Sequence, residues 1–571
     1  MVSIHIQSPS NQGHPLSYGN TPHKIAIIGG GPRGFYCLES LSRALRCHPR
    51  TGPIEIDIFD SCPYIGSGNV YDVNQPDFLR MNFPNGKIDA WSHGEFRGKD
   101  ELSLLSWLQA SYPQWANPEG FSPRAVVGRY LHECFEIVRS SLPENVTLNV
   151  HHLHIADVKK CNSQWIISTE DHRWVADDLV MTLGHEGWRS TNSLAEGDDR
   201  RLIERVFPVD SQLSRTRVAS KIRVAIRGFG LTWIDASLAL TEGRGGQFQP
   251  AVEDWTYDRS GDEPSKIYPY SRTGRPLLAK SIESQMELPP ILSDIWQSGS
   301  EAILDAARSA DPSQQVRDLW QSVTRTAGDV YQSIHPGLNS TLSKSRLDQW
   351  YKWWRSTFFP GFKAYDLMKQ SLNVGLGLAP PNEAWVWGET WRRIYPALVE
   401  RVSHGGISNE AWKLFRPISA EMERIAFGPP PENMSRMLAL IDSEVIDLNF
   451  VKGAKLAVRP NQLELIRDGI VEEVDVAINA VIPSPYQIDP HGPLSRLIAD
   501  KTISWQDRDI GLQIDQRGRP LSYPHENLAI FGRVTEGAVL GNDTLSRNLH
   551  PHIENWAKET AKRIFLRKLS H

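Results

Sequence analysis

A buried strand that runs directly into a glycine-rich turn and then into a helix is the feature that most restricts how this chain can fold. Residues 24–45 read KIAIIGGGPRGFYCLESLSRAL. The apolar run KIAIIG is typical of a strand inside a parallel sheet, and the apolar residues after the turn recur with helical spacing. Strand, turn and helix in this order form the first half of a dinucleotide-binding βαβ unit. The predicted fold class is therefore α/β.

The glycines of this turn have the G-x-G-x-x-G spacing. Gly29 would make the tight turn, Gly31 would let the backbone approach a pyrophosphate, and Gly34 would allow the helix to pack closely on the strand. The proline of GGGPRG stands in the first helical turn, where its missing N–H costs no hydrogen bond. The positive end of the helix dipole would favour the diphosphate.

The strand predicted next, IEIDIFD at 54–60, ends in a carboxylate. An acidic residue at this place accepts hydrogen bonds from a ribose diol, although Asp60 lies farther from the glycines than the usual ~20 residues. We predict that an adenine dinucleotide contacts Gly29, Gly31, Pro32, Arg33, Gly34 and Asp60.

A second, degenerate copy of the motif lies about 200 residues further on. The segment KIRVAIRGFGLTWIDASLALTEG (221–243) again places an apolar strand before Gly228 and Gly230 and a helix after them. Trp233 occupies the position of the third glycine, and Thr232 offers a hydroxyl to the phosphates instead. Two such units in one chain indicate a flavin and a nicotinamide that face each other.

The predicted strand KIYPYSRTGRP (266–276) ends in Ser271 and Arg272 rather than in an acidic residue. A cation at this place suits a 2'-phosphate and favours NADPH over NADH. Arg244 in GRGG is a rival for the same role, and an arginine in contact only with solvent is the alternative.

Bulk properties limit the partners. At 571 residues the chain is too long for one hydrophobic core, and the net charge of -5 favours small-molecule partners over nucleic acid or membrane. The five cysteines show no CxxC spacing, which argues against a dithiol reductase. No signal peptide and no apolar run of ~18 residues is visible, so we predict a cytoplasmic protein and leave homo-oligomerisation open.

Two further apolar segments are predicted to complete the two nucleotide folds. WVADDLVMTLGH (174–185) would bring Gly184 back to the first fold, and EVDVAINAVIP (473–483) would close the second. Tryptophans gather in the predicted helices between them, where an aromatic stripe is more often core than ligand cage. The predicted domains are a disordered tail at 1–23, an FAD-binding part at 24–205, an NADPH-binding part at 206–284, a helical substrate domain at 285–440, an NADPH-binding return at 441–484 and a C-terminal FAD-binding part at 485–571.

Several motifs carry a family resemblance. GGGPRG, PYIGSGNVYD (63–72), RMNFPNG (80–86), GFGLTWID (228–235) and FGRVTEGAVLGNDTLSR (531–547) occur in order along the chain. Together they resemble the FAD/NAD(P)-binding monooxygenases, a family that includes FAD-dependent urate hydroxylases and nitrosuccinate-forming aspartate N-monooxygenases. The resemblance runs from about residue 24 to residue 565.

The resemblance implies roles for particular residues. The first loop would hold FAD and the second NADPH, while Met81 and Asn82 would lie beside the isoalloxazine, Asn82 near its reactive face. The late segment would contact FAD through Gly532, Arg533, Thr535, Glu536 and Gly537. For Asp543 both a cofactor contact and simple helix capping stay open.

The resemblance also implies a reaction. NADPH would reduce FAD, the reduced flavin would capture O2 as a C4a-hydroperoxide, and this species would N-hydroxylate a small amine or amino acid such as aspartate. Ring hydroxylation of urate or a related heterocycle is one alternative, and flavin binding without turnover is another. A carboxylate-bearing substrate calls for a cation, for which Arg275, Arg355, Arg392, Arg393 and Lys87 are candidates.

Histidines occur in two clusters. HHLH (151–154) and HPHIE (550–554) both lack a convincing set of accompanying ligands. No metal site is therefore predicted.

Overall fold

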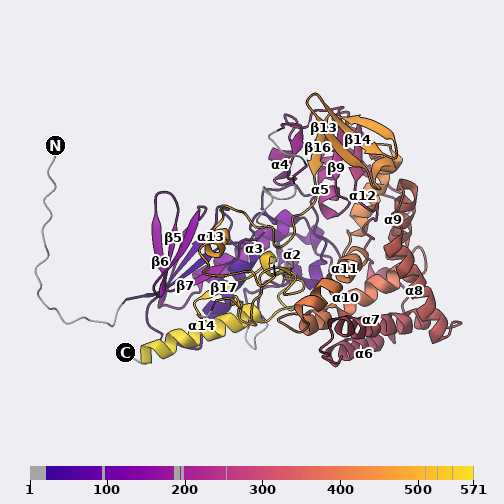
Figure 1. Cartoon of the computed structure of the whole chain (residues 1–571). Helices are drawn as coiled ribbons and strands as arrows, with labels where there is room; N and C mark the ends of the chain where they lie inside the picture. The colour runs from indigo at the N-terminus through magenta and orange to yellow at the C-terminus, as the bar shows by residue number, and fades with distance from the viewer. Residues whose placement is uncertain are drawn as a thin grey trace, which may run out of the picture.

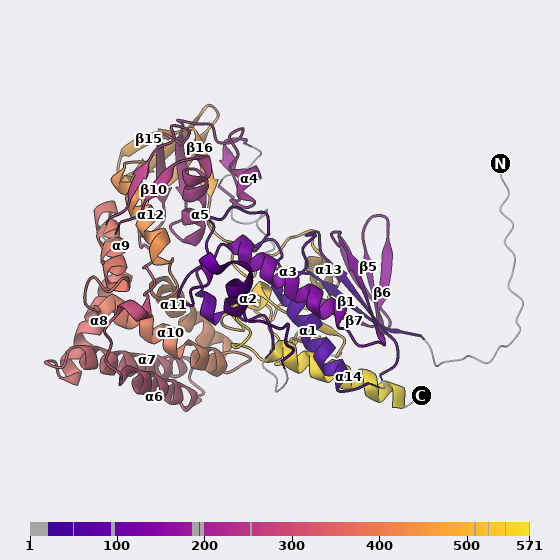
Figure 2. The ribbon, with the colours of Figure 1, turned by 180° about the vertical axis from the view of Figure 1, so that it is seen from behind.

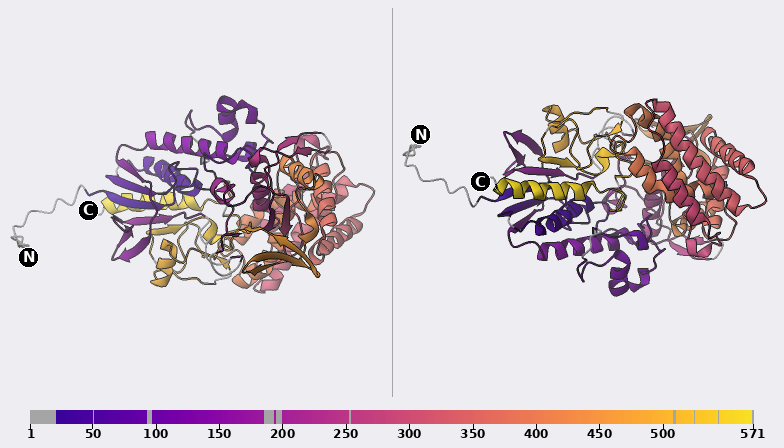
Figure 3. Two further views of the ribbon diagram at one scale, coloured as in Figure 1. Left: turned by 90° about the horizontal axis from the view of Figure 1, so that it is seen from above. Right: turned by 90° about the horizontal axis from the view of Figure 1, so that it is seen from below.

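The computed structural model describes residues 21–49, 51–92, 97–184, 193–194, 199–251, 254–507, 510–523, 525–542 and 544–569. Over these residues the chain forms two parallel sheets and a helical region (Figure 1). The first sheet lies at one end of the molecule, and helices α6 (Leu292–Leu304), α7 (Pro312–Ile334) and α8 (Ser340–Ser356) lie at the other, as the views from above and below confirm (Figure 3). The predicted α/β class is therefore confirmed.

The first sheet has five parallel strands in the order β17-β7-β1-β2-β3. Its central strands are apolar and buried on both faces, as expected for parallel strands covered by helices. Helix α1 packs against α3 and α14, so a helix near the C-terminal end of the chain covers the first βα unit. The elements are β1 (His23–Ile28), α1 (Pro32–Arg46), β2 (Ile54–Phe59), α3 (Arg124–Ser140), β3 (Val146–His151), β7 (Asp178–Met181), β17 (Leu528–Ile530) and α14 (His552–Leu569).

Smaller elements surround this sheet. An antiparallel sheet of β4, β5 and β6 precedes β7, so the predicted segment 174–185 contains the end of one strand and the whole of the next. The predicted return to the first fold is confirmed, because β7 pairs with β1. These elements are η1 (Asn85–Lys87), α2 (Leu104–Ser111), η2 (Pro113–Trp115), β4 (Asp157–Cys161), β5 (Gln164–Ser168), β6 (Arg173–Ala176), α13 (Pro493–Ala499) and η7 (Arg533–Thr535).

The second sheet has four parallel strands in the order β12-β9-β16-β8. Strand β16 pairs with β9, which confirms that 473–483 returns to the second fold. The two residues of β8 pair with β16, although they precede the predicted boundary at 205/206. Its elements are β8 (Leu202–Ile203), α4 (Val209–Gln212), β9 (Arg223–Arg227), α5 (Leu231–Ala239), η3 (Glu242–Arg244), β10 (Gln247–Gln249), β11 (Thr256–Asp258), β12 (Lys266–Tyr270), η5 (Leu448–Phe450), β13 (Lys455–Arg459), β14 (Gln462–Arg467), β15 (Ile470–Val474) and β16 (Val476–Asn479).

A run of helices separates β12 from β16 along the chain and extends away from both sheets (Figure 2). Side chains of Asp311, Asn339, Asn382 and Ser408 accept hydrogen bonds from backbone N–H groups in the first turns of four of these helices, which explains where they begin. The elements are η4 (Glu283–Gln285), α6 (Leu292–Leu304), α7 (Pro312–Ile334), α8 (Ser340–Ser356), α9 (Gly361–Gly375), α10 (Glu383–Val402), α11 (Asn409–Ala426) and α12 (Pro431–Asp442).

Tryptophans fill the interior of this helical region. Trp354, Trp387 and Trp391 are fully buried, and Trp387 stacks on Trp320 with ring centroids 5.2 Å apart. Offset aromatic pairs of this kind add to the energy of area burial. The tryptophans therefore form core, as the sequence favoured.

The predicted tail at 1–23 lies outside the described residues up to residue 20, and His23 already belongs to β1. The His23 ring contacts the Asp178 carboxylate at 2.6 Å, which fixes the start of the first sheet. No helix among the described residues combines the length and the apolar character needed to cross a bilayer.

Candidate functional site

The first glycine loop joins β1 to α1 with the geometry that its spacing predicts. Gly29 has φ +102, and a Cβ on Gly34 would collide with the carbonyl oxygen of Gly29. Only glycine therefore lets the helix approach the strand so closely. A Cβ on Gly31 would meet only Gly68, at an ordinary 3.6 Å, and the N-terminus of α1 has no side-chain cap. The uncapped N–H groups and the space at Gly31 fit a pyrophosphate.

Asp60 lies where β2 ends, directly beside this loop. Its Oδ2 atom accepts a hydrogen bond from the backbone N–H of Gly30 at 2.6 Å, and Oδ1 accepts one from Cys62 at 2.8 Å. A carboxylate has further lone pairs beyond these two bonds. The structure thus brings Asp60 to the glycine loop, where the ribose of an adenine dinucleotide is expected.

Pro32 begins α1, and Arg33 faces a distant part of the chain. The Arg33 guanidinium donates hydrogen bonds to the carbonyl oxygens of Asn542 and Thr544, at 3.2 and 2.7 Å. Arg33 therefore fastens the late segment to the start of α1. Asp543 stands between these two acceptors in the sequence and lies outside the described residues.

The late segment follows β17 and is held by its own side chains. Gly532 has φ +96 and Gly537 has φ +107, both in the region that favours glycine. The Thr535 hydroxyl donates to the carbonyl oxygen of Gly532 at 2.8 Å. Glu536 accepts hydrogen bonds from the N–H groups of Gly541 and Asn542. Thr535 and Glu536 therefore shape this loop through their hydrogen bonds. The backbone of the loop, rather than these two side chains, would face a cofactor.

Gly184 and Arg533 line a pocket of about 320 Å³ at the carboxyl ends of β7 and β17. Ligands of open α/β sheets bind at this edge. The Arg533 guanidinium also donates to the carbonyl oxygen of Pro483, just beyond β16 of the second sheet. The pocket therefore lies at the junction of the two nucleotide folds. It is lined by Leu183, Gly184, Ser484, Pro485, Gln487, Ile488, Leu494, Phe531, Arg533 and Val534.

The second glycine loop joins β9 to α5. Gly228 has φ +118, and its N–H donates to the carbonyl oxygen of Tyr270 at 2.9 Å. No heavy atom lies within 4 Å of a Cβ built on Gly230, which caps α5 and leaves its first N–H groups accessible. Thr232 is buried in the first turn of the helix. The open space before α5 fits a second diphosphate.

Strand β12 ends at Tyr270, beside the second glycine loop, so Ser271 and Arg272 stand at the expected edge. The Arg272 side chain is exposed. The Ser271 hydroxyl donates to the carbonyl oxygen of Val451 and accepts from the N–H of Gly274, which commits it to the turn. Lys452 is paired with Ser271 in an isolated bridge and adds a second cation that the sequence did not reveal.

Arg244, the rival for the 2'-phosphate, does not fit that role. Its side chain is buried, and its guanidinium donates to four backbone carbonyl oxygens, those of Leu213, Val218, Ala219 and Asp262. Donors used in this way are not available to a ligand. Arg244 holds together the chain around η3 instead.

The RMNFPNG loop meets the helical region at a group of positive charges. Met81 is buried, and its N–H donates to the carbonyl oxygen of Ser122. The half-buried Asn82 accepts a hydrogen bond through its carbonyl oxygen from the ammonium group of Lys280. We name the cation cluster by its four members, Lys87, Lys280, Arg392 and Arg393.

Two glutamates neutralise part of the cation cluster. Glu389 is buried and pairs with Arg392 and Arg393, and Glu283 pairs with Arg393. In the described part of the chain no carboxylate pairs with Lys280 or Lys87. Burial raises the pKa of Glu389, but the two arginines outweigh it and hold this pKa at about 2. The cluster therefore keeps a positive excess at neutral pH.

Lys280 is the buried member of the cluster, with 6% of its surface exposed. Burial, with the positive charges of Arg392 and Lys87, lowers its pKa to about 7, although Glu389 acts in the opposite direction. A pocket of about 280 Å³ is lined by Ala279 and Ser281, which flank Lys280 in the chain. Arg392 reaches the same pocket from α10. Lys87, Arg392 and Arg393 were predicted from the sequence as candidate cations for a carboxylate. Lys280 was not predicted, because its segment LLAKSIE carries no motif.

Residues 26–186 match the family model described as FAD-NAD(P)-binding. An L-aspartate N-monooxygenase (nitrosuccinate-forming) from Streptomyces davaonensis is 28% identical over 345 residues, which cover 54% of this chain and 52% of that protein. A nitrosuccinic acid synthase from Aspergillus oryzae is 26% identical over 333 residues, or 55% of this chain and 50% of that protein. The chain thus spans about half the length of these curated relatives.

Among solved structures, an L-lysine 6-monooxygenase from Pseudomonas syringae is 14% identical and aligns with 95% of this chain and 99% of its own, with a TM-score of 0.47. The matched residues 26–186 contain the whole first glycine loop, the second half of β1, and all of β2 and β7. Residues 26–186 therefore form an FAD-NAD(P)-binding domain, in a chain that is similar to nitrosuccinate-forming aspartate N-monooxygenases over about half of its length.

Proposed function

We propose that this chain is an FAD-dependent, NADPH-consuming monooxygenase that N-hydroxylates a small amino acid such as aspartate. One observation carries the choice of substrate: Lys280 of the cation cluster contacts the Asn82 carbonyl in the loop that is expected beside the flavin. The similarity to aspartate N-monooxygenases supports the same reaction.

The two glycine loops supply the cofactor sites of this proposal. The open N-terminus of α1 at Gly31 would hold the FAD diphosphate, and that of α5 at Gly230 would hold the NADPH diphosphate. The exposed Arg272, at the end of β12, would bind the 2'-phosphate. Bound FAD would supply the hydride acceptor for NADPH and the activation of O2. The chain itself would bind and orient the reactants and exclude water from them.

The cation cluster would bind the carboxylates of the substrate. Arginine forks hold a carboxylate through paired hydrogen bonds, and lysine adds a point charge. Glu389 contacts both Arg392 and Arg393, which fixes the planes of the two guanidinium groups before a ligand arrives. Arg392 lines the neighbouring pocket together with Ser281, Ser371 and Asn382, whose polar groups could contact a small ligand.

The same positive charge would prepare the substrate amine. An ammonium group has no lone pair, so oxygen transfer to nitrogen requires the neutral amine. Nearby cations disfavour the charged form of an amine and lower its pKa. The cation cluster would therefore attract the carboxylates and promote loss of the ammonium proton. Lys280, whose own pKa is about 7, can accept a proton at neutral pH.

Oxygen uptake and product formation test this proposal. The purified protein, loaded with FAD and supplied with NADPH, should consume O2 and form hydroxylated product with aspartate rather than only peroxide. Lys280→Met should raise the KM for aspartate while reduction of the flavin by NADPH stays near the wild-type rate. Lys369→Met is the matched control. Lys369 lies on α9 and pairs with Asp254, so this variant should behave as wild type.

Other outcomes would contradict the proposal. Turnover of urate instead of aspartate would assign ring hydroxylation, and the cation cluster would then not be an amino-acid site. Bound flavin with no oxygen consumption for any amine would leave a flavin-binding protein without turnover. An unchanged KM for aspartate in Lys280→Met would remove Lys280 from the substrate site.

A further inference from the structure

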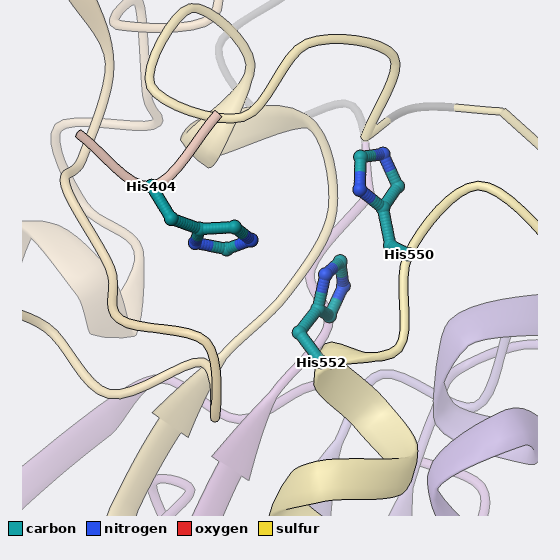
Figure 4. Close-up of side chains that lie close together, drawn as sticks. All are labelled: His404, His550 and His552. Carbon is teal, nitrogen blue, oxygen red and sulfur yellow. The ribbon is translucent and has the colours of Figure 1, made fainter. Parts of the chain in front are cut away.

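Three histidines from two distant parts of the chain converge beside the end of the first sheet. His404 follows α10, His550 precedes α14, and His552 begins that helix. Their coordinating nitrogen atoms all lie within 4.8 Å of one another. Figure 4 shows the three rings around a common space, with the ring of His404 extended toward the other two.

Two of these histidines are buried with unused nitrogen atoms. His552 is 0% exposed and His550 is 6% exposed. In the part of the chain that the structure describes, Nε2 of His550 and both ring nitrogens of His552 have no hydrogen-bond partner. Buried polar atoms are nearly always satisfied, because an unpaired one costs free energy. Each of these two buried rings therefore carries an unpaired nitrogen, which points to a missing ligand.

The third histidine is held in the orientation that metal ligands adopt. His404 Nδ1 lies 3.3 Å from the carbonyl oxygen of Ile514, a distance at which Nδ1–H can donate. A proton on Nδ1 leaves the lone pair on Nε2, where it can coordinate a metal. Histidines that bind a metal through one ring nitrogen usually donate a hydrogen bond from the other. The backbone of His404 has φ +52, so the side chain is presented from an uncommon turn conformation.

We infer that His404, His550 and His552 bind one divalent transition-metal ion, of the class of Zn²⁺. Imidazole suits Zn²⁺, and three histidines are a known tetrahedral set that leaves the fourth position to a small ligand. Ligand atoms 2.0–2.1 Å from a tetrahedral ion are about 3.4 Å apart, so the ligand atoms need to approach one another by up to about 1.4 Å. Rotation about the side-chain torsions supplies such a movement.

Charge around the site defines the fourth ligand. The positive charge of Arg33 is close enough to act on His550 and His552. A neighbouring cation weakens the binding of a metal cation, and an anionic fourth ligand such as hydroxide would offset this effect. No other histidine, cysteine, aspartate or glutamate belongs to this cluster among the described residues.

The ion would act as a cross-link between two parts of the fold. His404 belongs to the turn between α10 and α11 of the helical region, whereas His550 and His552 belong to the start of α14, which packs on α1. The His552 ring also stacks on Phe531, directly after β17, with centroids 5.1 Å apart. One metal ion would thus join the helical region to the first sheet, whatever reaction the chain performs.

Metal content and metal-dependent stability test this inference on the full chain with its flavin. The protein, freed of metal by a chelator and then dialysed, should bind one Zn²⁺ or Co²⁺ per chain, and its Tm should rise on addition of Zn²⁺. Co²⁺ should give the visible d–d bands of a tetrahedral site. His404→Asn tolerates a positive φ and is a poor ligand, so it should lose the stoichiometric binding.

A matched control uses a histidine with the same backbone contact. The Nδ1 atom of His132 lies 2.9 Å from the carbonyl oxygen of Ile65, outside the cluster, so His132→Ala should bind the metal as wild type does. The inference is overturned if wild-type protein binds no stoichiometric Zn²⁺ or Co²⁺. It is equally overturned if His404→Asn retains the binding and the rise in Tm. Neither readout depends on monooxygenase activity, so failure of the proposed function would leave this test intact.

Discussion

The guanidinium of Arg124 in α3 lies 2.8 Å from the carboxylate of Asp235 in α5, and this ion pair joins the two nucleotide folds. The two side chains are 14% and 4% exposed. Helix α3 packs against α1 after the first glycine loop, and α5 begins at the second. The pair therefore sets the position of one cofactor loop relative to the other.

Removal of Arg124 should destabilise the protein. Arg124→Met leaves the Asp235 carboxylate buried without a counter-charge, a change that costs about 3–5 kcal/mol in comparable cases. Urea unfolding measures this free energy. Arg139→Met on the same helix is the control, because its pair with Glu136 is exposed and should contribute less than about 1 kcal/mol. Equal losses in the two variants would contradict the assigned role of Arg124.

Gly31→Val should abolish retention of FAD and leave the fold intact. The backbone of Gly31 has φ -70, which valine adopts, and a Cβ there meets only Gly68, at an ordinary 3.6 Å. The added methyl groups would occupy the place of the pyrophosphate. Circular dichroism and the visible flavin spectrum of the purified variant report the two properties separately. A yellow, folded variant would show that the pyrophosphate lies elsewhere.

Gly34→Ala is expected to fail for a different reason. Its Cβ would collide with the carbonyl oxygen of Gly29 in the protein itself, so α1 would have to move away from β1. We expect loss of thermal stability in addition to loss of FAD, as measured by Tm with and without added flavin. A normal Tm for this variant would contradict the close packing of the loop.

Arg272→Ala should raise the KM for NADPH about 10- to 100-fold, since a hydrogen bond to a charged group contributes about 1.5–3 kcal/mol. The KM for NADH, which has no 2'-phosphate, should hardly change. Arg244→Met provides a contrast, because four carbonyl oxygens would lose their donor. Arg244→Met should therefore lower the stability of the protein without changing the ratio of the KM values for NADPH and NADH. Unchanged NADPH kinetics in Arg272→Ala would place the 2'-phosphate elsewhere, with Lys452 as the next residue to test.

Binding of succinate, a dicarboxylate without an amine, should weaken as the pH rises above about 7. Lys280 has a pKa of about 7, so its positive charge is present below this pH and is lost above it. The dissociation constant, measured by flavin fluorescence or calorimetry, should rise by up to about tenfold per pH unit. Lys280→Met should remove this dependence, and Lys369→Met should keep it. A flat profile in the wild type would show that Lys280 does not contact the carboxylates.

Features that depend on neighbouring residues in the chain could be predicted from sequence. The turn at Gly29 and the close approach at Gly34 follow from one short segment, since the strand before it and the helix after it fix the geometry. The return strands β7 and β16 could be found because each is an apolar run of the right length. Local patterns therefore located both glycine loops.

Features that depend on residues far apart in the sequence could not be predicted. Arg244 had the right charge and a plausible place, but the sequence does not show that its donors are used by four carbonyl groups. Lys280 contacts Asn82, which is 198 positions away in the sequence. His404 lies beside His550 and His552 although it belongs to a different region of the fold. Such groups come together only through packing, so a histidine pair near the C-terminal end gave no hint of a third ligand.

The position of β17 has a consequence for biosynthesis. This strand, residues 528–530, completes the edge of the first sheet next to β7, which has been synthesised some 350 residues earlier. During synthesis, β7 therefore has one unpaired strand edge until the second sheet and the helices have been made. The nascent chain therefore cannot complete this sheet before residues 528–530 have been synthesised. A product terminated before that point would carry the glycine loop together with an open sheet edge, a target for chaperones and proteases.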